Sequence, residues 1–188
     1  MLADEDRSAS PAKAWLIVGL YIGVVYVTLP VAPRLWFSLS PVLISFSSVA
    51  IFVLLLPLAC LAVFLFQQWK TERHYLVWQV TLCVSLVLLS WLLILQVAVA
   101  PAEIVHLLEY GGLGYLIGWA AKISKFVSWP MFGCFVLINL AGSGDEAIQY
   151  LLPNRYFEMR DILLNVWCGT VGLVVWLLLS RPPNRLTI

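Results

Sequence analysis

Charged residues are scarce in this chain. Asp, Glu, Lys and Arg make up 11% of its 188 residues, whereas 62% are hydrophobic. A soluble globular domain carries about 25% charged and about 45–50% apolar residues, so the shortage of charge excludes an ordinary soluble domain. The chain also lacks an excess of one sign, with 11 basic and 10 acidic residues. A broad nucleic-acid surface needs a marked basic excess, so no nucleic-acid partner is expected.

Cysteine is also sparse, and its pattern predicts no metal site. The four cysteines (Cys60, Cys83, Cys134 and Cys168) each lie inside an apolar run without metal-knuckle spacing. We interpret them as small buried hydrophobic residues, with a disulfide between neighbouring helices as the lesser alternative. The N-terminus lacks the basic start of a secretory signal, because residues 4–6 are Asp, Glu and Asp. The first apolar run is therefore expected to remain as a span.

Long apolar runs are the main feature of the chain. A membrane-spanning helix needs about 20 mostly apolar residues. Six runs approach this length, at about residues 14–31, 42–66, 76–100, 103–121, 126–140 and 161–180. The sequence therefore predicts an all-α fold, a polytopic transmembrane helix bundle with about six spans. We divide it into an N-terminal region with two spans, residues 1–75, and a four-helix membrane domain, residues 76–188.

The basic residues predict the orientation of the bundle, because cytoplasmic loops carry an excess of Lys and Arg. With the N-terminus inside, eight basic residues lie in inner segments and three in outer ones. The inner set is Arg7, Lys13, Lys70, Arg73, Lys122, Lys125, Arg181 and Arg185, and the outer set is Arg34, Arg155 and Arg160. Both termini are therefore predicted to be cytoplasmic.

Glycines recur in the fourth and sixth runs. Gly111, Gly114 and Gly118 lie in the fourth run, and Gly169 and Gly172 lie in the sixth. Gly114 and Gly118 are four residues apart, a spacing typical of helices that pack closely in membranes. We predict a helix-packing role for all five glycines.

The segment from Gly142 to Pro153 is predicted to form a short interfacial helix before the last span. Ser143 and Glu146 have the spacing of a capping box, and Asp145 suits the positive end of a helix dipole. Pro153 opposes continuation of the helix. Asp145 and Gln149 are four residues apart and therefore share a face.

Polar residues also mark the starts of the fourth and sixth runs, on the side predicted to be outside. The combined candidate site comprises Glu103, His106, Glu109, Tyr110, Asp145, Glu146, Gln149, Arg155, Asp161 and Asn165. Ionisable residues within membrane segments are functional candidates by default. The competing interpretation is that each of them only stabilises a helix end. The site hypothesis requires that these side chains converge.

Two ordered motifs carry a resemblance to a known family. The first is Glu103-x-x-His106-x-x-Glu109-Tyr110, and the second begins Asp145-Glu146-x-x-Gln149 and continues through Pro153, Arg155, Asp161, Asn165, Gly169 and Gly172. Together they resemble the VanZ-like family of bacterial integral membrane proteins over about residues 76–188. The resemblance implies a multi-pass protein of the bacterial inner (plasma) membrane with an outer polar site. It supplies no reaction, because the family's mechanism is not established.

The favoured hypothesis is that the chain binds or handles the head group of a cell-envelope lipid or glycolipid. Arg155, or a protonated His106, would meet a phosphate. The acidic residues would hold sugar hydroxyls or a divalent cation. Membrane lipid is therefore the expected partner.

Two other classes of function remain open. In a membrane-embedded enzyme, His106 beside Glu109 would act as a general base, with a hard cation on Asp145, Glu146 and Asp161. In an accessory subunit of a larger membrane complex, the apolar helix faces would contact partner proteins. The chain has neither a nucleophile elbow nor an HExxH run. No reaction, resident metal or cofactor is assigned, and haem ligation by His106 ranks last.

Overall fold

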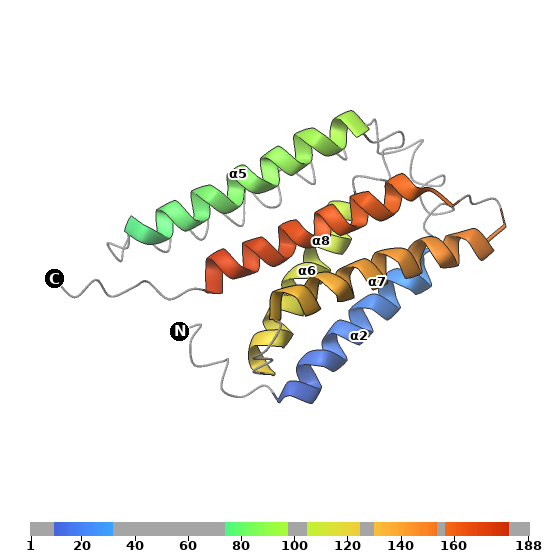
Figure 1. Cartoon of the computed structure of the whole chain (residues 1–188), viewed down its shortest axis with the longest axis horizontal. Helices are drawn as coiled ribbons and strands as arrows, with labels where there is room; N and C mark the ends of the chain where they lie inside the picture. The colour runs from blue at the N-terminus through green and yellow to red at the C-terminus, as the bar shows by residue number, and fades with distance from the viewer. Residues whose placement is uncertain (1–9, 32–73, 98–104, 125–129, 154–156, 181–188) are drawn as a thin grey trace.

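The computed structural model describes residues 10–31, 74–97, 105–124, 130–153 and 157–180. All secondary structure in these ranges is α-helical, as Figure 1 shows. The helices are α2 (Pro11–Thr28), α5 (His74–Val97), α6 (Val105–Ile123), α7 (Pro130–Leu151) and α8 (Met159–Ser180). The all-α prediction is confirmed.

Three of these helices are long and apolar enough to cross a membrane, namely Pro11–Thr28, Met131–Leu151 and Met159–Ser180. The apolar stretch of α5 is shorter and covers Gln79–Ile94. α6 is not among the candidate spans, because it carries His106, Glu109, Lys122 and several glycines. The predicted run at 42–66 lies outside the described residues. The described residues therefore support a membrane protein with three candidate spans and do not support the count of six.

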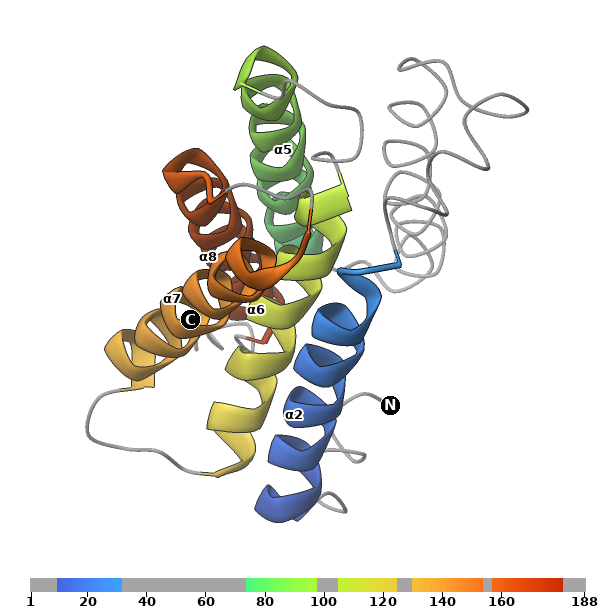
Figure 2. The same ribbon diagram turned by 90° about the vertical axis from the view of Figure 1, so that its right-hand side faces the viewer.

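α6 lies at the centre of the bundle. It packs against α8, α2 and α7, and Figure 2 shows it between α2 on one side and α7 and α8 on the other. Its buried residues Tyr110, Leu113 and Ile117 recur at helical spacing. α5 lies against α8. Any polar group on the inner face of α6 is consequently surrounded by other helices.

The contact between α6 and α8 is made backbone to backbone through glycines. A Cβ atom at Gly114 would collide with the carbonyl group of Gly169, and one at Gly172 would collide with the carbonyl group of Gly111. A Cβ atom at Gly118 would collide with the ring of Trp176. A packing role was predicted for these five glycines. At Gly114, Gly118, Gly169 and Gly172 a Cβ atom would overlap a neighbouring residue, whereas at Gly111 it would stand at an ordinary contact distance of 3.8 Å from the carbonyl oxygen of Cys168.

The prediction of a separate interfacial helix before the last span is wrong. α7 runs without interruption from Pro130 to Leu151, and Ser143 lies inside it rather than at an N-cap. Gly142 and Gly144 lie inside this helix, and a Cβ atom would meet Asn165 at the first and Tyr26 at the second. Asp145 and Glu146 therefore lie in the C-terminal half of a long helix and gain nothing from the positive end of its dipole.

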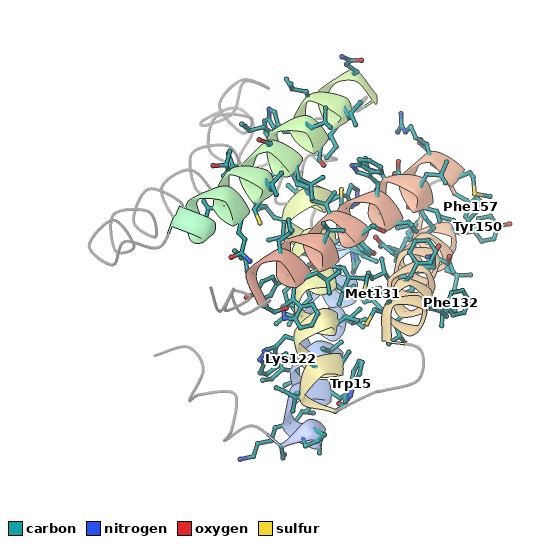
Figure 3. The ribbon with its side chains drawn as sticks, turned by 60° about the vertical axis from the view of Figure 1, so that its left-hand side comes forward. Trp15, Lys122, Met131, Phe132, Tyr150 and Phe157 are labelled. Atoms are coloured by element: carbon teal, nitrogen blue, oxygen red, sulfur yellow. The ribbon has the colours of Figure 1, made fainter. Side chains whose placement is uncertain are left out.

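Large apolar side chains cover the outer faces of the described helices. On α2, Leu20, Val24 and Val27 are more than half exposed. Phe132 and Tyr150 on α7, with Phe157 next to it, point away from the other helices in Figure 3. Such outer faces are compatible with contact to lipid.

Candidate functional site

Asp145 connects three helices. Its Oδ2 atom accepts hydrogen bonds from the Tyr110 hydroxyl of α6 at 2.8 Å and from Asn165 Nδ2 of α8 at 3.3 Å. Its Oδ1 atom accepts one from Gln149 Nε2 at 3.2 Å. Asp145 and Asn165 are fully buried, and Tyr110 is 1% exposed. One carboxylate therefore holds α6, α7 and α8 together inside the bundle.

Glu146 connects the same end of α7 to the start of α8. Its Oε1 atom accepts a hydrogen bond from Gln149 Nε2 at 3.3 Å, and its Oε2 atom accepts one from the backbone N–H of Glu158 at 3.0 Å. Glu146 is fully buried, like its neighbour Asp145. The amide group of Gln149 thus bridges two adjacent carboxylates. We call Tyr110, Asp145, Glu146, Gln149 and Asn165 the buried polar cluster.

His106 and Glu109 lie beside the buried polar cluster on α6. The Nδ1 atom of His106 is 3.9 Å from Oε2 of Glu109, and its ring centroid is 6.0 Å from that of Tyr110. The His106 side chain is 13% exposed and that of Glu109 is 33% exposed. Nδ1 of His106 is buried without a hydrogen-bond partner among the described residues. This pair is therefore more accessible than the cluster and has hydrogen-bonding capacity to spare.

Asp161 lies at the rim rather than in the cluster. Its Oδ1 atom accepts a hydrogen bond from Arg160 Nε at 3.3 Å, and Arg160 also forms an ion pair with Glu158 at 2.9 Å. Glu158 and Asp161 interact electrostatically with Glu146. Glu158, Arg160 and Asp161 lie partly exposed next to the buried acids, and we call these three residues the charged rim.

α2 reaches the site through two tyrosine hydroxyls. Tyr21 donates to the backbone carbonyl of Glu109 at 2.9 Å, and Tyr26 donates to that of Ala141 at 2.7 Å. Tyr26, Glu109 and Tyr110 line a narrow crevice where α2 meets α6 and α7, with no room for a water-sized molecule. α2 therefore closes this side of the cluster.

The structure brings five of the ten predicted site residues into one hydrogen-bonded cluster: Tyr110, Asp145, Glu146, Gln149 and Asn165. His106 and Glu109 adjoin the cluster, and Asp161 lies in the charged rim. Glu103 and Arg155 fall outside the described residues.

Sequence reasoning missed Tyr21, Tyr26, Glu158 and Arg160. A signal was present for the tyrosines, because a phenol inside an apolar run needs a hydrogen-bond partner. Glu158 acts through its backbone N–H, which no sequence pattern reveals. Arg160 entered the sequence argument only as one of the basic residues that set orientation.

The described residues contain no group of three or more His, Cys, Asp or Glu side chains arranged to hold a metal ion. Asp161 pairs with Arg160 instead of joining Asp145 and Glu146. The arrangement of these three acids therefore gives no support to the divalent-cation hypothesis.

Comparisons with protein-family models, curated proteins and solved structures find no match to this chain. The VanZ-like resemblance therefore rests on the two sequence motifs alone.

Proposed function

We propose that this chain is a VanZ-like integral membrane protein that binds the head group of a cell-envelope lipid or glycolipid. The binding site lies at the end of the bundle where α6, α7 and α8 meet. We further propose that the chain has about six spans in a bacterial inner membrane, that both termini are cytoplasmic, and that the site faces outward. Membrane lipid is the partner.

The observation that carries this proposal is the layering of polar groups at that end. The fully buried carboxylates of Asp145 and Glu146 cross-connect the helices. Next to them, partly exposed, lie His106, Glu109 and the charged rim. The buried layer is cross-connected by hydrogen bonds between helices and lies out of reach of bulk solvent, so a lipid head group would contact the accessible layer.

The chemistry of the accessible layer fits a hydroxyl-bearing head group. Carboxylates accept hydrogen bonds from sugar hydroxyls, and a histidine nitrogen without a partner either accepts or donates. A phosphate linked to that sugar would pair with a guanidinium group, which binds phosphate in a bidentate manner. Arg155 lies between α7 and α8 in the sequence and is our candidate for that contact.

The test is lipid analysis of the protein purified in mild detergent, as wild type and as the Glu109→Gln and Arg155→Ala variants. Loss of one hydrogen bond to a charged group costs about 1.5–3 kcal/mol, which corresponds to roughly 10–100-fold weaker binding. We therefore expect the co-purifying lipid to fall by at least tenfold in each variant.

Lys122→Gln is the matched control, because it removes a charge from the same helix at the opposite end, near Trp15 in Figure 3. Lipid content that is equal in wild type, Glu109→Gln and Arg155→Ala would refute the proposal. A stoichiometric protein in place of lipid would favour the accessory-subunit function instead.

A further inference from the structure

The buried polar cluster holds two carboxylates whose described partners are all neutral. Asp145 and Glu146 meet a phenol hydroxyl, two side-chain amides and one backbone N–H. No described residue forms an ion pair with either of them. Two adjacent carboxylates buried in the charged state are costly unless a positive charge compensates them.

Asn165 provides a second, independent observation. It is fully buried on α8, and its Nδ2–H bond to Asp145 places its amide group against that acid, which is next to Glu146 in α7. Its Oδ1 atom is buried and has no hydrogen-bond partner among the described residues. A buried acceptor without a donor costs about 1–3 kcal/mol, so the site contains one more oxygen than its donors satisfy.

Rotating the Asn165 amide by half a turn does not remove this excess. The rotation would bring Oδ1 to face Asp145 Oδ2, and two acceptors would then lie together without a hydrogen atom between them. In either orientation the oxygens of Asp145, Glu146 and Asn165 lack one positively charged or hydrogen-donating partner.

We propose that Asp145, Glu146 and Asn165 form a binding site for one small monovalent cation, taken from water as a proton or as an alkali ion. A single positive charge lowers the net charge of the acid pair and supplies the partner that Asn165 Oδ1 lacks. A monovalent charge suits the site better than a divalent metal, because the described residues bring no three ionisable ligands together. The site does not depend on lipid binding, because the acids are buried without any ligand.

Other titratable or charged groups surround the site and set the background of any pH response. They are Tyr26 on α2, His106, Glu109 and Tyr110 on α6, and Glu158, Arg160 and Asp161 at the start of α8. The readout must therefore be a difference between wild type and variants in which only the two buried acids are neutralised.

The experiment measures the unfolding temperature of the full chain in detergent by tryptophan fluorescence, from pH 5 to pH 9. Lithium, sodium or potassium chloride is compared with choline chloride at equal ionic strength, because choline is too large for the site. An alkali-ion site predicts that sodium or lithium raises the unfolding temperature of wild type at high pH by about 2–4 °C or more. A proton site predicts a fall of that size with rising pH in every salt.

Asp145→Asn/Glu146→Gln is predicted to lose whichever response wild type shows. Lys122→Gln is the control that keeps it, because Lys122 lies in the last turn of α6, at the end of the bundle away from the buried acids. Equal pH and salt responses in wild type and the double variant would overturn the proposal.

If the double variant does not fold, infrared spectroscopy of wild type provides the second measurement. A proton site predicts a protonated-carboxyl band at neutral pH in choline chloride, and an alkali-ion site predicts a shift of the carboxylate bands on adding sodium or lithium. Wild-type protein that shows neither change contradicts the proposal without any variant.

Discussion

At the scale of single residues, the shortest of the three side-chain hydrogen bonds to Asp145 comes from the Tyr110 hydroxyl, at 2.8 Å. Tyr110 comes from the central helix, so this bond connects the acid to the middle of the core. A hydrogen bond to a charged group contributes more to stability than one between neutral groups. A buried acceptor that loses its donor also keeps the cost of its removal from water. Tyr110 therefore stabilises both the bundle and the position of Asp145.

Tyr110→Phe tests this contribution. Removal of the hydroxyl leaves the ring in place, and we expect the free energy of unfolding to fall by about 1.5–3 kcal/mol. Denaturation of the purified protein measures the change. Tyr150→Phe is the matched control, because Tyr150 is 70% exposed and surface changes usually stay within about 0.5 kcal/mol. Equal effects of the two substitutions would contradict the assigned bond.

At the scale of elements, the α6–α8 contact depends on the absence of side chains. Gly114 and Gly172 each lie against a backbone carbonyl of the other helix. Because backbone cannot move aside as a flexible side chain can, an added methyl group must separate the helices. That separation would also strain the hydrogen bonds by which Asp145 joins Tyr110 of α6 to Asn165 of α8.

Gly114→Ala is therefore expected to destabilise the protein by about 1–3 kcal/mol, the usual cost of overpacking. Gly133→Ala is the control on α7, because nothing lies within 4 Å of a Cβ atom placed there. Alanine forms helices better than glycine, so the control should be neutral or stabilising. Thermal unfolding of both variants makes the comparison, and a Gly114→Ala protein as stable as wild type would contradict the packing.

The elements also show how far sequence reasoning reaches. The spacing of Asp145 and Gln149 predicts a shared face, and the two side chains form a hydrogen bond. The separate interfacial helix was wrong, because α7 continues through Gly142 and Gly144, whose close neighbours Asn165 and Tyr26 lie on other helices. Local signals therefore identify polar faces, whereas tertiary contacts decide where a helix ends.

At the scale of the whole molecule, the two ends of the bundle differ in chemistry. The end with the starts of α6 and α8 carries the buried polar cluster and the charged rim. At the other end, Trp15 Nε1 donates to Ser124 Oγ at 2.7 Å, and Lys122 in the last turn of α6 lies near Trp15 (Figure 3). The basic-residue bias predicts that the first end faces outward and the second faces the cytoplasm.

Cysteine labelling in intact cells tests this orientation. We expect Glu158→Cys to react with a membrane-impermeant maleimide in intact cells, and Lys122→Cys to react only after permeabilisation. Both positions are exposed, so accessibility to the reagent differs only by the side of the membrane. The unmodified chain corrects for native cysteines, of which Cys83, Cys134 and Cys168 are buried. The opposite pattern would reverse the predicted orientation.

The hydrogen bonds of Asp145 also bear on the order in which the chain assembles. Tyr110 and Gln149 precede Asn165 in synthesis, so a chain that has folded α6 and α7 but not α8 holds an acid with only part of its partners. Until α8 docks, hydrocarbon next to that acid is unfavourable. Arrival of the last helix therefore completes the hydrogen bonding of Asp145, and a chain without α8 differs from the finished protein by a carboxylate that lacks the Asn165 donor.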